Sequence, residues 1–199
     1  MPRISAPTVA EHRTMVQQQL VDAAEQILRS GQPDALTASA VTHAVGIARN
    51  SIYRYVDSVD DLRGLVLARH LPSWLDAVES ELASIEDPAD RIAVWVRANV
   101  EQAARSGHGW LMSLGQTTAP SEATIKVMES AHAIMRDVLS NAWGKLVDDR
   151  DAAMVGAALV RGLLDACFKQ LEAGRDVELV ARLGEESARR VVATVIEGC

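Results

Sequence analysis

The sequence is poor in cysteine, in aromatic residues and in long apolar runs. Only two cysteines occur, Cys167 and Cys199, so neither a disulfide framework nor a cysteine metal site is expected, and both are interpreted as free thiols in a reducing compartment. No run of eighteen apolar residues occurs, and no signal-like apolar segment follows the basic start. These absences predict a soluble, cytoplasmic protein that does not span a membrane.

Motifs for catalysis and for metal binding are also missing. No histidine pair has the four-residue spacing that places two imidazoles on one helical face, since the five histidines are His12, His43, His70, His108 and His132. The chain contains no G-x-S-x-G elbow, no phosphate-binding loop and no dinucleotide fingerprint. We therefore expect no enzymatic activity, no metal site and no cofactor.

The charge balance argues against a general nucleic-acid binder. The 199 residues carry a formal net charge of −7. Up to Val56, however, five basic residues stand against four acidic ones, so this part has a net charge of +1 and the remainder carries −8. Because an acidic body repels phosphate, only the first part of the chain is suited to face a duplex.

The most informative stretch runs from Leu36 to Val56 and predicts two short helices joined by a tight turn. Thr37 is a candidate N-cap, and Gly46 stands where a helix end favours a left-handed residue. The second helix, expected at about 48–56, is rich in hydrogen-bond donors suited to a DNA major groove: Arg49, Asn50, Ser51, Tyr53, Arg54 and Tyr55. By spacing alone, a purely structural helical hairpin with half-buried tyrosines fits equally well.

A resemblance favours DNA binding. The segment from Val16 to Leu71 resembles the N-terminal domain of the TetR family of bacterial one-component regulators, through the run GIARNSIYRYV and the following DSVDDLRGLVLARHL. The family often has Gly where this chain has Asn50, and usually a Lys where this chain has Val59. The resemblance implies that Arg49, Asn50 and Ser51 approach base edges, that Tyr53, Arg54 and Tyr55 divide between bases and phosphate, and that Thr37 donates to phosphate.

The rest of the chain predicts an all-α protein of about nine helices, because no alternating strand pattern of useful length occurs. Residues 1–10 are expected to form a flexible arm, either a disordered tail or a segment whose Arg3 reaches DNA. A three-helix DNA-binding domain with a helix-turn-helix follows at 11–57, and a larger helical regulatory and dimerisation domain at 58–199. Pro72 predicts a kink or a new helix start, as a hinge or as a plain break.

The last two helices are unusually apolar. The run DAAMVGAALVRGLLDACFKQL carries small residues on one side and large apolar residues around the rest, so it must be buried on several sides. A central core helix and a subunit interface both satisfy this pattern. The resemblance favours a homodimer through the last two helices, and two-fold symmetry then demands a palindromic DNA operator with half-sites about one turn, about 34–36 Å, apart.

Adaptable, polarizable side chains are concentrated in the middle helices and suggest walls for a small-molecule effector. For any single one of them, an ordinary core position is the better explanation, but the family commonly binds inducers between its middle helices. The resemblance thus implies a ligand pocket, with the candidates Trp95, His108, Trp110, Met112, Gln116, Met128, Met135 and Phe168. The shortage of Arg and Lys among these candidates suggests a neutral or weakly polar ligand.

Taken together, these patterns predict a TetR-type transcriptional repressor that binds its operator as a dimer and is released by a small hydrophobic ligand. Two alternatives remain open at this point. One is a DNA-binding regulator that responds to no ligand, and the other is a helical carrier or scaffold that does not bind DNA.

Overall fold

The structure, a computed structural model, describes residues 9–30, 33–106 and 121–199. Every regular element in these ranges is a helix, which confirms the all-α expectation. The chain divides into two compact units, one of residues 1–70 with 110–128 and one of residues 71–109 with 129–199. The boundary expected at residue 58 therefore stays a prediction. None of the described helices is both long and apolar enough to cross a membrane.

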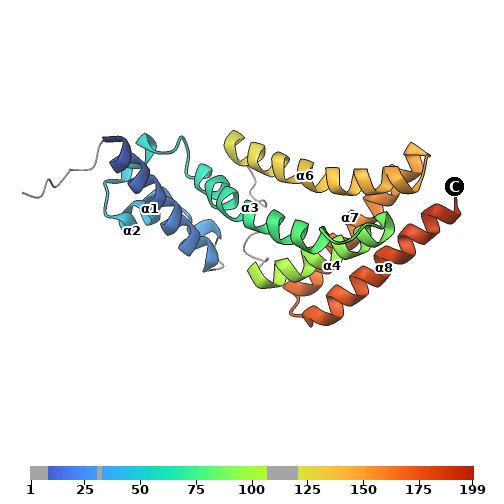
Figure 1. The fold of residues 1–199 in the computed structure, drawn as a ribbon. Helices are drawn as coiled ribbons and strands as arrows, with labels where there is room; N and C mark the ends of the chain where they lie inside the picture. Colours follow the sequence, from blue (N-terminus) through green and yellow to red (C-terminus); the bar gives the residue numbers. More distant parts are fainter. Residues whose placement is uncertain (1–8, 31–32, 107–120) are drawn as a thin grey trace, which may run out of the picture. The chain divides into compact units, whose positions relative to one another are not determined.

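The first unit is a small helical cluster around a helix-turn-helix (Figure 1). Its α1 lies against α2, and α2 lies against the short 3₁₀ helix η2. Apolar side chains at helical spacing on α1, among them Leu20, Ala24 and Leu28, are fully or almost fully buried. The elements of this unit are α1 (Val9–Arg29), η1 (Pro33–Ala35), α2 (Ala38–Val45), η2 (Arg49–Arg54) and the first turns of α3 (Asp61–Leu82) and α6 (Glu122–Leu146).

The second unit is built around α4 (Pro88–Ser106), whose residues are buried on most sides. The last helix, α8 (Val177–Glu197), runs along α4, and α7 (Arg150–Glu172) packs against both (Figure 1). Asp149 and Asp176 cap the starts of α7 and α8 by accepting hydrogen bonds from backbone amides of the first turn. These caps fix where the two helices begin.

Two expectations about helices differ from the structure. No new helix starts at Pro72, because α3 continues through it to Leu82. Pro72 lies on the exposed side of α3, where water can satisfy the backbone carbonyl that loses its hydrogen-bond partner. The buried Trp74 and Val78 hold the next turn of the helix in place. The second helix of the helix-turn-helix is a 3₁₀ helix at 49–54 rather than an α-helix at 48–56, as is common for so short a piece.

Gly156 on α7 is needed for close packing, and its replacement should destabilise the protein. A Cβ built there would lie 2.6 Å from the Cη2 atom of Trp143 on α6, so Gly156→Ala must displace a buried indole. We expect a loss of about 1–3 kcal/mol of unfolding free energy from this overpacking. Gly144→Ala is the matched control, since a Cβ there meets nothing within 4 Å and should stabilise α6 by up to about 1 kcal/mol. Thermal unfolding of both variants tests the contrast, and equal shifts would contradict it.

Candidate nucleic-acid interface and effector pocket

The turn of the helix-turn-helix is held by backbone hydrogen bonds that require a glycine. The Thr37 hydroxyl accepts a hydrogen bond from the amide of Ala40 at 3.1 Å, which caps α2. At the other end, Gly46 has φ 78°, and the amides of Gly46 and Ile47 donate to the carbonyls of His43 and Thr42 at 3.3 and 3.0 Å. This pair of bonds is a Schellman motif, in which the left-handed residue is usually glycine. The turn therefore fixes the direction in which η2 leaves α2.

The short helix η2 presents its polar side chains to solvent because an apolar residue anchors it from beneath. Ile52 is fully buried in the core of the first unit. Around it, Arg49, Asn50, Tyr53 and Arg54 are exposed, with Tyr53 at 54%, while Ser51 and Tyr55 are half-buried. An exposed tyrosine among donors on a rigidly held short helix is typical of a surface that reads a nucleic acid.

The start of α3, directly after η2, is held by a reciprocal capping box. The Ser58 hydroxyl accepts from the Asp61 amide at 3.2 Å, and the Asp61 carboxylate accepts from the amides of Asp57 and Ser58 at 2.9 and 2.8 Å. Burial by itself raises the pKa of Asp61, but hydrogen bonds from Ser121, Ser58 and Asp57 outweigh it, so the pKa lies below its ordinary value. The ionised carboxylate thus positions α3 behind η2.

We expect Asp61→Asn to lower the unfolding free energy by about 1 kcal/mol at pH 7, the usual contribution of a helix cap. Because the folded-state pKa is lowered, this contribution is present above the ordinary pKa of aspartate and is lost as the pH falls through the folded value. The difference between the wild-type protein and the variant should therefore shrink below about pH 4. Urea unfolding at pH 7 and at pH 3 measures it, and a difference that grows toward acid would contradict the assignment.

A second contact joins the start of α6 to the start of α3 within the first unit. The Asp60 carboxylate accepts from the Ser121 amide at 2.7 Å, and the Thr124 hydroxyl donates to the Asp60 carbonyl at 3.1 Å. Gly64 allows this close approach, because a Cβ there would lie 2.8 Å from the Thr124 hydroxyl oxygen. The helix that continues into the second unit is thereby fastened beside the capping box.

Beside η2 lies a cavity of about 360 Å³ that the sequence did not reveal. It is lined by Tyr53, Arg54 and Tyr55 together with Arg13 and Gln17 of α1. Arg13 is exposed and adds a cation next to the candidate DNA-binding residues. No sequence motif marks it, because Arg13 precedes the start of η2 at Arg49 by 36 positions and only the fold brings them together.

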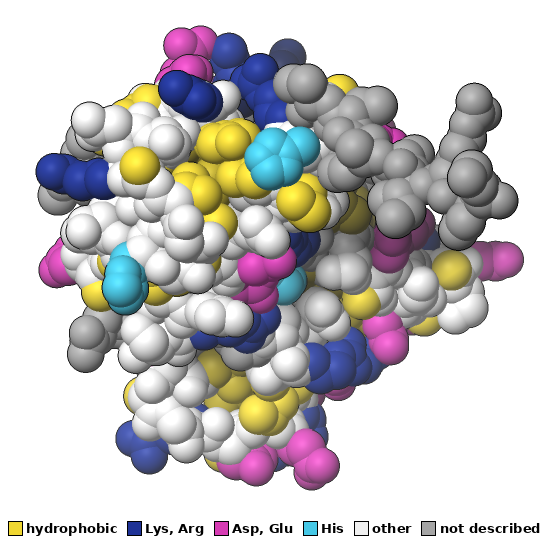
Figure 2. Space-filling model, turned by 90° about the vertical axis from the view of Figure 1, so that its left-hand side faces the viewer, with side chains coloured by type: hydrophobic (Ala, Val, Ile, Leu, Met, Phe, Trp, Pro, Cys, Tyr) yellow, Lys and Arg dark blue, Asp and Glu magenta, His cyan; other side chains and the backbone are white. Residues whose placement is uncertain are grey.

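Charge on the molecular surface is mixed. On the face drawn in Figure 2, Lys and Arg side chains are interspersed with Asp and Glu instead of forming one continuous basic surface. Broad electrostatic attraction is thus a poor source of affinity for nucleic acid, and specific contacts from few residues must carry more of it.

The second unit contains a pocket of about 230 Å³ between α3, α4 and α6. Trp95 and Met135, two of the predicted ligand residues, line it together with Trp74 and Asn99, which the sequence analysis missed. The indole of Trp74 donates to the Asn99 side-chain oxygen at 3.0 Å, and the Asn99 amide donates to the Trp95 carbonyl at 2.8 Å. These bonds fix the orientation of a buried polar group at the pocket wall.

Two other predicted ligand residues that the structure describes, Met128 and Phe168, do not line this pocket. Phe168 lies half-buried on α7, and Met128 belongs to the first unit. His108, Trp110, Met112 and Gln116 lie outside the described residues. Within residues 9–30, 33–106 and 121–199, no group of three or more acidic, histidine or cysteine side chains is suited to a metal ion.

The chain is similar to known proteins in sequence over part of its length and in fold over most of it. No protein-family model matches the chain. An uncharacterized HTH-type transcriptional regulator of Mycobacterium tuberculosis, matched in two strains, is 26% identical to this chain over 85 residues. The match covers 43% of this chain and less than half, 42%, of that regulator. A TetR-like transcriptional regulator from Rhodococcus sp. RHA1 superimposes with a TM-score of 0.68 at 16% identity, over 94% of this chain and 99% of the other.

This chain has the TetR-like fold. Two further solved structures share it at 16% sequence identity. AibR, in complex with isovaleryl coenzyme A and operator DNA, has a TM-score of 0.64 over 85% of this chain and 96% of its own. RolR, in complex with resorcinol, has a TM-score of 0.59 over 92% and 95%. The TetR-like fold expected from the run GIARNSIYRYV is thus confirmed.

Proposed function

We propose that the protein is a transcriptional regulator that binds duplex DNA through η2. The observation that carries the proposal is the set of exposed donors around the buried Ile52, held by the glycine turn of a TetR-like fold. Arg49, Asn50 and Ser51 would approach base edges at the start of η2. Asn50 is chemically suited to read adenine, and its side chain is exposed.

Phosphate contacts would surround this reading surface. Tyr53, Arg54 and Tyr55 would divide between bases and phosphate, and the exposed Arg13 beside them adds a further phosphate contact. The Thr37 hydroxyl accepts from Ala40 but still has its own proton to donate to a phosphate oxygen. This small set of contacts suits a chain with a net charge of −7, which cannot rely on general attraction to DNA.

The proposed regulator acts as a homodimer through α7 and α8. Large apolar side chains stand exposed on both helices, Val155 at 57% and Leu159 at 52% on α7, with Leu179 and Leu183 on α8. Such a surface is costly in water and is suited to a second copy of the same face. A two-fold axis then calls for a palindromic operator with half-sites about one helical turn apart.

We propose repression that is relieved by a small, neutral or weakly polar ligand in the pocket of α3, α4 and α6. Among the described lining residues there is no Lys or Arg, and the acidic Asp76 and Glu79 disfavour an anion. The volume of about 230 Å³ suits a molecule of few heavy atoms. RolR, which shares the fold, was solved with resorcinol, a small neutral phenol. Because α6 carries both Met135 of the pocket and Thr124 at the Asp60 carbonyl, a ligand that prefers one position of α6 can bias the DNA-binding unit.

Selection of bound duplexes from a random DNA pool at about 150 mM salt tests the function. Enrichment of a palindrome with half-sites about one turn apart is the expected result. The recovered duplex then serves as a probe, and resorcinol and related phenols are screened for release of the protein. A folded dimer that enriches no sequence would contradict the proposal and favour a helical carrier.

A further inference from the structure

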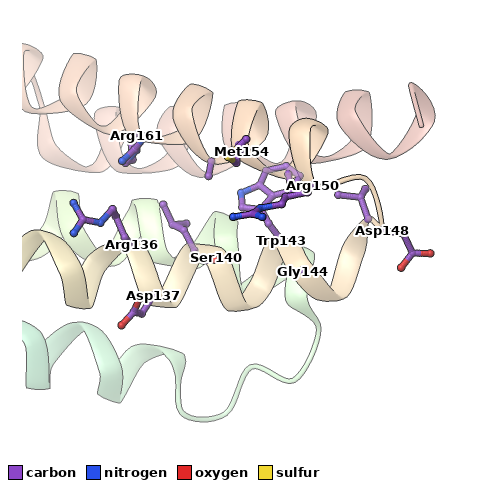
Figure 3. Close-up of a pocket in the computed structure, with 13 residues that line it drawn as sticks. Arg136, Asp137, Ser140, Trp143, Gly144, Asp148, Arg150, Met154 and Arg161 are labelled. Carbon is purple, nitrogen blue, oxygen red and sulfur yellow. The ribbon is translucent and has the colours of Figure 1, made fainter.

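A pocket of about 620 Å³ lies between α6 and α7 of the second unit (Figure 3). It shares no lining residue with the pocket of α3, α4 and α6. Its volume falls within the range of small-molecule sites, roughly 300–1,000 Å³. Neither DNA reading nor the proposed effector pocket accounts for it.

Three arginines line this pocket: Arg136 from α6, and Arg150 and Arg161 from α7. None of them forms a hydrogen bond or ion pair with another described residue. Asp137 and Asp148 also line it, so the lining keeps a net charge of +1. Figure 3 shows Arg136 and Ser140 projecting from α6 toward α7 and Arg161 on the facing side of α7. Guanidinium groups in this arrangement are suited to bind a carboxylate through paired hydrogen bonds.

Trp143 supplies the second, independent observation. Its side chain lines the pocket and is 1% exposed, yet its indole Nε1 has no hydrogen-bond partner among the described residues. Buried indole N–H groups usually have an acceptor. The absence of a side chain at Gly156 lets the ring pack against α7, so its position is well determined. An unpaired donor on the wall of a cationic pocket indicates an acceptor that a ligand would bring.

The arginine pair, Arg136 with Arg161, and the unpaired N–H of Trp143 lie at different positions along the pocket. Arg136 precedes Trp143 by seven residues on one helix, which corresponds to about 10 Å. Leu139, Val147, Ala153, Met154 and Ala157 add apolar lining. Met154 is 56% exposed and unbranched, so it can change rotamer to admit a ligand.

We propose that this pocket binds a small organic acid with an apolar body. One carboxylate lies between Arg136 and Arg161, the body lies along Trp143, and a second acceptor at the far end receives the Trp143 N–H and pairs with Arg150. The site is separate from the proposed effector pocket and does not depend on the proposed DNA binding.

Decanedioate is the probe, because its two carboxylates are separated by an apolar chain of about the required length. Its binding to the full-length protein is measured by isothermal titration calorimetry, beside decanoate and 1-decanol. We expect decanedioate to bind more tightly than decanoate, and 1-decanol to bind at least about ten-fold more weakly than either, since it lacks the charge for the arginines. Equal affinity for all three, or no binding of decanedioate at about 1 mM, would overturn the proposal.

Two variants locate the site. Arg136→Ala with Arg161→Ala should weaken decanedioate binding by at least about ten-fold. The matched control, Lys145→Ala with Lys169→Ala, removes one exposed cation from each of the same two helices outside the pocket and should leave binding unchanged. If both double variants weakened decanedioate binding equally, the loss would reflect net charge alone, and the proposed site would be wrong.

Trp143→Phe tests the far end. It removes the unpaired N–H but keeps an aromatic ring, so we expect it to abolish the advantage of decanedioate over decanoate while decanoate still binds. Far-ultraviolet circular dichroism and thermal unfolding confirm that the variant is folded. If the advantage persists in the folded variant, the second acceptor does not lie at Trp143 and the two-ended assignment is wrong.

Discussion

The protein with Tyr53→Ala and Arg54→Ala should lose at least about 100-fold of its affinity for the selected operator. An arginine placed on a guanine contributes roughly 1–3 kcal/mol of discrimination, and a tyrosine contact to base or phosphate adds to this loss. About 2.7 kcal/mol in total corresponds to 100-fold. Because both side chains are exposed and the buried Ile52 is untouched, the fold and the dimer should persist. Fluorescence anisotropy with labelled duplex measures the affinity, and size-exclusion chromatography the dimer.

The matched control is Arg105→Ala, which removes an exposed cation at the end of α4 in the other unit. The single variant Arg54→Ala distinguishes a phosphate contact from a base contact. If Arg54 touches phosphate, the slope of log affinity against log salt should fall by about one unit, and the loss should be similar on all sequences. If it reads a base, the slope should change little and discrimination at one operator position should disappear. Unchanged affinity in the double variant, with the dimer intact, would remove η2 from the interface.

Val155→Glu with Leu159→Glu should convert the dimer to monomers and weaken operator binding by at least about 100-fold. The two side chains are adjacent on one face of α7 and more than half exposed, so they contribute little to the folding stability of the isolated chain. In the proposed dimer, carboxylates at these positions would be buried without partners, which costs several kcal/mol. Each monomer would then hold only one half-site, and the linked gain of the second, typically 10²–10⁴-fold, would be lost.

Ser80→Glu with Ala104→Glu is the control for added charge, because it places two carboxylates at exposed positions of α3 and α4. Sedimentation equilibrium distinguishes monomer from dimer in each protein. A stable dimer in the α7 variant would show that the subunits meet through another surface, and the operator symmetry would then have to be derived from that surface.

Local signals were enough to predict most of the helices. The N-caps Thr37, Asp149 and Asp176 and the left-handed Gly46 are local features, since each acts through hydrogen bonds or backbone angles within one turn of chain. The new helix start expected at Pro72 was wrong, because the cost of a proline in a helix depends on whether its side of the helix is exposed. The 3₁₀ form of η2 was not predicted, because a short run of residues does not by itself distinguish a 3₁₀ turn from an α-helical turn.

The functional surfaces also divide into features that the sequence predicts and features that only packing decides. The sequence by itself determined an all-α chain with a helix-turn-helix and the residues of its reading helix, because these depend on periodicity, caps and one glycine turn. Only the tertiary structure brought Arg13 beside Arg54. It also placed Trp74 and Asn99 at the pocket that contains Trp95. In the pocket of α6 and α7 it placed Arg136 opposite Arg161. It alone also showed that the N–H of Trp143 is buried without a partner. These features depend on packing between segments distant in sequence, and local propensity carries no information on which side chains will meet.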